Sequence, residues 1–322
     1  ASGSVLRNRD LDHSIRYRYF EAVIMPVALY GSELWANGML TCEKVERVIA
    51  TALRFIVFAP PKSSRVAVGW ELGYEPFHLR VAARRARLFQ KWLGLNTAAA
   101  PSALWAKRIF DSRVAVKGKA WSWFRRTEHM AREWLSVKRI NSALDVKFAL
   151  AKSSLVFYKH WSQKGNFAYR RLLGSLHEAE SELNIAPCLR VRGSNAHVFL
   201  QLRTGSLWFN DRVSKFVKER TSACMSCFDV NRHTATKETL EHFLIECPRY
   251  REERESWATG WRCPYDSLFS HGPLCVSAAL GESVQFFGGA DSSEFQKCRM
   301  LSIRSMWNKR CAILAQSLPP LL

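Results

Sequence analysis

Residues 77–93, Phe-His-Leu-Arg-Val-Ala-Ala-Arg-Arg-Ala-Arg-Leu-Phe-Gln-Lys-Trp-Leu, repeat basic and apolar side chains with the period of an α-helix. At about 100° per residue, four basic residues fall within an arc of roughly 60° and the large apolar ones fall in the arc beside it. The basic residues are Arg80, Arg84, Arg87 and Lys91. Only Arg85 lands inside the apolar side. We therefore expect an amphipathic helix that packs through one stripe and exposes a basic one.

The segments on either side of this helix follow the same period. Upstream, apolar residues recur helically from Thr41 to Val57, and the pair Pro60-Pro61 is expected to end that helix. Downstream, residues 119–140 place Trp and Met on one face and Arg125, Arg132 and Arg139 opposite. The fold class predicted from these patterns is mainly α.

Positive charge is concentrated in the part of the chain that contains these helices. The chain has 322 residues, with 48 Lys and Arg against 28 Asp and Glu, a net charge of +20. Residues 1–170 hold 29 basic and 12 acidic residues, whereas residues 221–322 hold 11 of each. Such an excess indicates an anionic partner, with nucleic acid first and an acidic membrane second. The alternative is that the stripes are ordinary solvated helix faces.

Six basic residues of the two stripes are predicted to contact nucleic-acid phosphates. They are Arg80, Arg84, Arg87, Lys91, Arg125 and Arg132. Contacts of this kind position a nucleic-acid backbone without reading its sequence.

A cysteine-histidine cluster gives the most specific local signal. Cys224 and Cys227 form a C-x2-C pair, and His242 and Cys247 follow after fourteen residues as H-x4-C. Four sulfur and nitrogen ligands at such spacings are typical of a structural Zn²⁺ site, which has no open position for catalysis. His233, inside the fourteen-residue loop, is the second choice for the histidine ligand. The alternative is four unrelated residues.

Catalytic motifs are missing from the sequence. It contains no Asp-Asp pair of the kind that holds two divalent ions, no glycine-rich phosphate loop, and neither a G-x-S-x-G nor an H-E-x-x-H motif. We expect no independent enzymatic activity.

Two stretches of the chain resemble one protein family. Residues 18–79 contain Ile24-Met-Pro26-Val-Ala-Leu-Tyr30-Gly31-Ser32-Glu33-Leu-Trp35 and later Glu71-Leu-Gly73-Tyr-Glu-Pro76. Residues 201–254 contain Gln201-Leu-Arg-Thr-Gly205, the C-x2-C pair and Glu238-Thr-Leu-Glu-His242-Phe-Leu-Ile-Glu-Cys247-Pro-Arg-Tyr250. In this order they resemble the part of non-long-terminal-repeat (LINE-like) retrotransposon reverse transcriptases that follows the polymerase core.

The resemblance implies three regions and a role. Residues 1–100 would be a thumb-like basic helical domain, 101–190 a helical connector, and 191–322 a CCHC zinc-finger and helical module. Together they would hold RNA, DNA or their hybrid during target-primed reverse transcription, as part of a longer polyprotein. The family's catalytic Asp pair has no counterpart here, so no catalytic residue carries over. The fourteen-residue spacing is also much longer than in retroviral knuckles, which puts the role of the finger in base contact in doubt.

Two rival interpretations stay open at this stage. In the first, the chain is a zinc-stabilised protein-interaction module whose basic face has no role in binding. In the second, it is a degenerate retroelement remnant. The apolar runs are too short to span a bilayer, so we expect no membrane partner. Nine unevenly spaced cysteines do not form a secreted disulfide framework, which favours a reducing nuclear and cytoplasmic location.

Overall fold

The structure is a computed structural model that describes residues 2–93 (without 9, 37 and 62), 123–137, 143–164, 196–228 (without 219), 236–259 and 293–317. Every regular element in these ranges is a helix, and an isolated antiparallel bridge pairs Ala223 with Lys237. The predicted mainly α-helical class is confirmed. Within the same ranges, no helix is both long and apolar enough to cross a bilayer.

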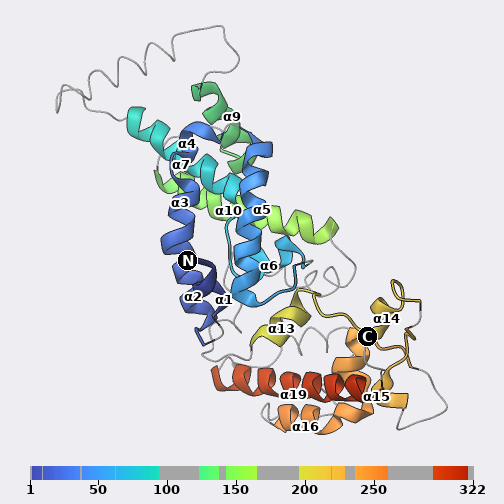
Figure 1. Cartoon of the computed structure of the whole chain (residues 1–322). Coiled ribbons are helices and arrows are strands. Elements are labelled where there is room, and N and C mark those ends of the chain that lie inside the picture. The colour runs from blue at the N-terminus through green and yellow to red at the C-terminus, as the bar shows by residue number, and fades with distance from the viewer. Residues whose placement is uncertain are drawn as a thin grey trace.

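The helices before residue 165 form the upper group in Figure 1. They are α1 (Ser2–Arg7), α2 (His13–Tyr19), the π-helix η1 (Phe20–Ile24), α3 (Met25–Leu29), α4 (Ser32–Trp35), α5 (Met39–Val57), α6 (Arg65–Glu71), α7 (Phe77–Leu93), α9 (Trp123–Leu135) and α10 (Ala143–Lys164).

The helices after residue 195 form the lower group. They are α13 (Ala196–Arg203), α14 (Asn210–Val213), α15 (Met225–Phe228), the π-helix η2 (His242–Glu246), the 3-10 helix η3 (Pro248–Tyr250), α16 (Arg251–Thr259) and α19 (Ser293–Ser317).

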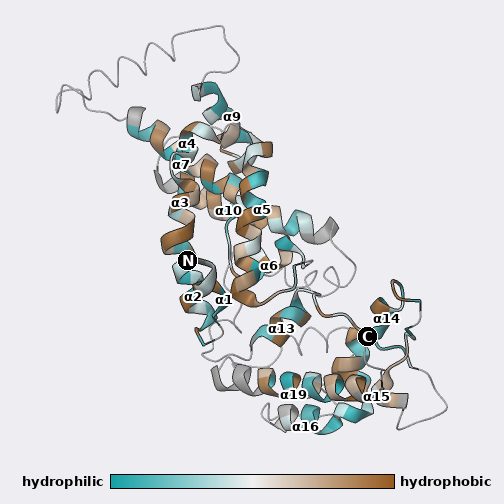
Figure 2. Ribbon diagram, in the orientation of Figure 1, coloured by the Kyte–Doolittle hydropathy of each residue, from teal (hydrophilic) through white to brown (hydrophobic). Residues whose placement is uncertain are grey.

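Helix α7 is the central element of the upper group. It packs against α4, α5, α9 and α10, and Phe77 and Val81 of its apolar stripe are completely buried. In Figure 2, the hydrophobic residues of α5, α7 and α10 lie where these helices meet. The amphipathic helix predicted from residues 77–93 is therefore present, and its apolar stripe joins the core.

Arg85 is also buried, as its place on the apolar side of the wheel indicates. Its Nε donates to Thr127 Oγ1 at 3.2 Å, and its guanidinium lies 5.0 Å from the centre of the Trp123 ring. Both partners belong to α9. The one basic residue that departs from the stripe thus fastens α9 onto α7.

Helix α5 differs in detail from its prediction. It begins at Met39, before Thr41, and ends at Val57 because Phe58 adopts a left-handed conformation with φ of 51°, ahead of the two prolines. Ile49, Leu53 and Ile56 are buried, but Val48, which shares their period, is 71% exposed. The periodicity therefore predicted the helix correctly, but its prediction that Val48 is buried is wrong.

Helix α13 connects the two groups. Arg203 Nε donates to Glu71 Oε2 at 2.8 Å, in a pair that is almost fully buried. Gln201 Nε2 donates to the carbonyl oxygen of Phe58 at 2.7 Å. On its other side, α13 packs against α19. Residues 184–195, in which Pro187 and Gly193 indicate a linker, lie outside the described residues.

Candidate metal centre and basic groove

Cys224, Cys227, His242 and Cys247 come together as the spacing predicts. All four are buried, and one donor atom from each lies within 4.8 Å of every other. The Sγ of Cys247 lies 4.0 Å from that of Cys224 and 3.5 Å from that of Cys227, whose Sγ is 3.2 Å from His242 Nε2. These four residues form the Cys/His cluster.

Short-range backbone contacts position the four donors. Around the Ala223–Lys237 bridge, Cys224 N donates to Thr236 O at 2.8 Å, and Cys227 N donates to Cys224 O at 3.2 Å. The apolar residues Leu240, Phe243 and Leu244 indicate a short helix over residues 237–246, but the helix begins at Leu240 because Lys237 takes part in the bridge. Thr239 Oγ1 accepts from His242 N at 3.0 Å and so caps this helix.

The cluster has the donor set and dimensions of a metal site. A tetrahedral ion with Zn–S bonds of about 2.3 Å keeps its sulfurs about 3.8 Å apart. The observed sulfur separations of 3.5 and 4.0 Å lie on both sides of that value. His242 Nδ1 lies 3.4 Å from the Glu246 carboxylate, which leaves Nε2 directed at the sulfurs. The four residues could therefore hold a metal ion.

The electrostatics of the cluster also favour a cation. The hydrogen bond between Cys224 and Cys247 lowers the pKa of Cys224 and raises the pKa of Cys247, because it stabilises the first as a thiolate and holds the proton on the second. Deprotonating all three thiols requires a positive charge among them, which a divalent ion supplies.

Side chains around the cluster attach it to the neighbouring helices. Ser226 and Tyr250 share a 2.8 Å hydrogen bond, and Arg254 Nη2 donates to Cys247 O at 2.6 Å. The Glu238 carboxylate accepts from Asn210 N at 2.9 Å and also binds Arg310 of α19. His233, the second choice as a ligand, lies outside the described residues.

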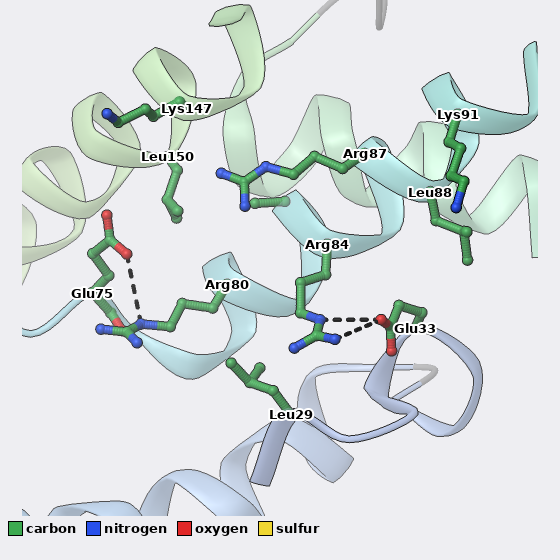
Figure 3. A pocket seen from close by; sticks show the side chains of 11 residues that line it. Leu29, Glu33, Glu75, Arg80, Arg84, Arg87, Leu88, Lys91, Lys147 and Leu150 are labelled. Atoms are coloured by element: carbon green, nitrogen blue, oxygen red, sulfur yellow. Dashed lines mark hydrogen bonds and ion pairs between the residues drawn. The ribbon is translucent and has the colours of Figure 1, made fainter. Parts of the chain in front are cut away.

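A second feature is a groove of about 610 Å³ lined by α7, α10 and the α3–α4 segment. All four basic residues predicted on α7 line it, as Figure 3 shows. Its charged side chains are Glu33, Glu75, Arg80, Arg84, Arg87, Lys91 and Lys147. We call it the basic groove.

Two of its arginines are held by carboxylates. Arg80, with a side chain only 13% exposed, donates from Nη1 and Nη2 to the two oxygens of Glu21, both at 2.8 Å. Arg84 lies 2.9 Å from Glu33 Oε1 and is 38% exposed. Figure 3 shows Arg84 turned toward Glu33 at one side of the groove. Both guanidiniums thus have a protein partner already.

The other cations of the groove are exposed. Arg87, Lys91 and Lys147 form no hydrogen bond or ion pair with the described residues. In Figure 3 the Arg87 side chain extends from α7 toward Leu150 of α10. Lys147 was not predicted, because nothing in its own helix marks it; its place opposite α7 is a property of the fold.

Arg125 and Arg132, predicted from the second stripe, are both exposed on α9. They do not line the basic groove, and Arg132 lies 3.9 Å from Glu128 on the same helix. The structure therefore brings the α7 residues together with Lys147, whereas the α9 pair lies outside the groove lining.

Comparisons of the chain with protein-family models, with curated proteins and with solved structures found no match.

Proposed function

We propose that the basic groove binds a nucleic-acid backbone. The observation that carries this proposal is that three exposed cations project from two helices around one groove and form no hydrogen bond or ion pair with the residues that the structure describes. They are Arg87, Lys91 and Lys147. Such cations gain from replacing condensed counterions at phosphates. Arg80 and Arg84 take a different role, since Glu21 and Glu33 already neutralise them. They position the walls of the groove.

The ion of the Cys/His cluster is, in this proposal, Zn²⁺. Three thiolates and an imidazole are the soft and borderline ligands that Zn²⁺ accepts, and four protein ligands close its tetrahedral shell. The role of the ion is then structural. It would join the turn that carries Cys224 and Cys227 to the helix that carries His242.

We further propose that the chain is the C-terminal part of a LINE-like reverse transcriptase, with the upper group as its thumb and connector. The order of motifs at residues 18–79 and 201–254 supports this origin. Within these motifs, Glu71 and Arg203 form a buried ion pair with each other, and Glu238 forms one with Arg310. Glu71, Arg203 and Glu238 of these motifs thus help to hold the described helices together.

Contact with the rest of such a polyprotein has its own supporting observation. The segment 23–40 exposes several large apolar side chains that a partner could cover. They are Val27, Tyr30, Leu34 and Leu40, each more than 60% exposed. This segment covers the motif that resembles the family just after its polymerase core.

Fluorescence anisotropy with labelled single-stranded RNA, single-stranded DNA and an RNA–DNA hybrid, across a series of KCl concentrations, tests the groove. The variant Arg87→Gln/Lys91→Gln/Lys147→Gln should bind weakly and lose about 2 to 3 from the log-log salt slope. A matched control, Lys44→Gln/Arg47→Gln/Lys152→Gln, removes the same charge from exposed residues outside the groove. Equal losses in the two variants would mean that net charge, not the groove, drives binding. A chain that binds no nucleic acid tightly would instead favour the protein-interaction module.

A further inference from the structure

A second cavity, of about 240 Å³, lies between α5, α6, α7 and α10. None of its lining residues belongs to the basic groove. Sites for drug-sized ligands span about 300–1,000 Å³, so this cavity suits a smaller group.

One wall of the cavity is aromatic. His78, Phe157 and Trp161 follow one another, with ring centres 5.4 Å apart for His78–Phe157 and 6.2 Å for Phe157–Trp161. Trp161 is 40% exposed, so part of its ring remains free to contact a ligand. Burial lowers the pKa of His78 to about 4, so its imidazole is neutral at physiological pH. The wall therefore offers uncharged π faces.

The lining also contains three charged residues, Glu43, Glu46 and Arg65. Glu43 and Glu46 come from successive turns of α5, and Glu46 Oε2 accepts from Phe77 N at 2.8 Å. Glu43 forms no hydrogen bond or ion pair with the described residues, so both of its oxygens are available. Arg65, also in the lining, is exposed and has no such partner either.

We propose that this cavity binds one nucleobase, guanine, from a single-stranded nucleic acid. The base stacks on Trp161, its N1–H and N2–H donate to the Glu43 carboxylate, and Arg65 contacts a phosphate of the same strand. Among the bases, guanine presents two parallel N–H donors on its Watson–Crick edge, which matches a free carboxylate.

The guanidinium of Arg65 favours a nucleotide over an organic cation. An aromatic wall with carboxylates also suits an ammonium or guanidinium group. Arg65 in the same lining repels such a cation, whereas a nucleotide has both donors for Glu43 and an anion for Arg65. The positive excess of residues 1–170 also attracts polyanions to this part of the chain.

Saturation-transfer difference NMR of the full chain with guanosine 5′-monophosphate tests the assignment without using the groove. We expect saturation of the guanine H8 proton, and its loss in Trp161→Ala. The groove variant Arg87→Gln/Lys91→Gln/Lys147→Gln should keep the signal, so failure of the groove and failure of the cavity give different results. If H8 is not saturated at millimolar nucleotide, or is saturated equally in Trp161→Ala, the proposal is wrong.

Competition between nucleotides tests the role of Glu43. The wild type should prefer guanosine to adenosine, cytidine and uridine monophosphates, and Glu43→Gln should lose that preference while still stacking a base. Replacing Trp161 by Ala should weaken binding of a single-stranded oligonucleotide about 5- to 160-fold. If N-acetyl-lysine methylamide displaces the nucleotide at lower concentration than guanosine monophosphate binds, the cavity is a cation site instead. Circular dichroism melting of each variant controls for folding.

Discussion

Arg310 and Glu238, 72 residues apart, form a bidentate ion pair that is almost completely buried. Nε and Nη2 of Arg310 lie 2.7 and 2.8 Å from the two carboxylate oxygens, and the side chains are only 5% and 2% exposed. Glu238 also accepts from Asn210 N at the start of α14. The Glu238 carboxylate therefore joins α19 and α14 to the segment that follows the Ala223–Lys237 bridge and leads to His242.

Breaking this ion pair should strongly destabilise the lower group of helices. Arg310→Met leaves the Glu238 carboxylate buried without its cation, which costs on the order of 3–5 kcal/mol. The double variant Glu238→Gln/Arg310→Met should recover part of that loss, because no buried charge remains. Urea unfolding followed by tryptophan fluorescence measures both. The exposed pair Arg251–Glu255 is the control, and Glu255→Gln there should change stability by under about 1 kcal/mol.

Removal of one cluster ligand should remove the metal and unfold its surroundings. Protein purified under reducing conditions should contain one zinc per chain by atomic emission spectroscopy, and Cys227→Ser should contain little and melt at lower temperature. Cys311→Ser is the matched control, because Cys311 is exposed and outside the cluster. Wild-type protein without stoichiometric zinc, together with an unchanged melting temperature in Cys227→Ser, would contradict the zinc assignment.

Local patterns in the sequence were enough for the mainly α class, for the helix over residues 77–93 and for the Cys/His cluster. The periodicity of residues 77–93 predicted both the buried stripe and the shared arc of Arg80, Arg84, Arg87 and Lys91, because a helix fixes angles between near neighbours. The C-x2-C and H-x4-C spacings likewise predicted a set of donors that the structure brings together. Arg85 was a usable signal as well, since its departure from the pattern marked its burial.

Contacts between distant segments could not be predicted in this way. The sequence does not show that Arg80 meets Glu21, 59 residues earlier, or that Lys147 faces the groove from α10. Such pairings depend on how helices pack, and a single sequence contains no record of that. For the same reason, the sequence does not distinguish the exposed Arg87 from the ion-paired Arg80 and Arg84 on the same stripe.

The arginines of the basic groove should therefore differ in their mutant properties. Arg87→Gln should reduce the log-log salt slope of nucleic-acid binding by about 0.7 to 0.9 with little effect on stability. Arg80→Gln should lower stability instead, because it leaves Glu21 and the shielded wall of the groove without their cation. Anisotropy titrations and urea unfolding of the same two variants separate these effects. If Arg80→Gln instead reduced the salt slope and left stability unchanged, the Arg80–Glu21 pair would have to open when nucleic acid binds.

Glu46 should make stability depend on pH in the opposite sense from an ordinary carboxylate. Burial raises its pKa from 4.5 to about 7, so the folded chain binds the proton more tightly than the unfolded chain. The stabilisation is complete below about pH 4.5 and is lost as the pH rises through about 7. Glu46→Gln keeps an acceptor for Phe77 N and should be more stable than wild type at pH 8, on the order of 2 kcal/mol. Urea unfolding of both proteins from pH 5 to pH 8 measures the difference, and a pH-independent difference would refute it.

Gly69 should tolerate no side chain while Tyr158 keeps its hydroxyl. A Cβ at Gly69 would lie 2.5 Å from Tyr158 Oη, and that hydroxyl is fixed by donating to Tyr74 O at 2.6 Å. Gly69→Ala should cost about 1–3 kcal/mol through overpacking. The double variant Gly69→Ala/Tyr158→Phe should lose less stability than the sum of the losses in the two single variants. A double-mutant cycle by urea unfolding measures this difference.

Helix α19 adds Met300, Ile303 and Met306 to the same core as Phe199, Cys224 and Phe243. During synthesis, the residues of the Cys/His cluster leave the ribosome well before this helix does. The four residues that could hold a metal ion are thus synthesised early, but the lower group completes its core only after Arg310 has emerged. Until then, the apolar surface that α19 covers is open to chaperones and to premature association with other chains.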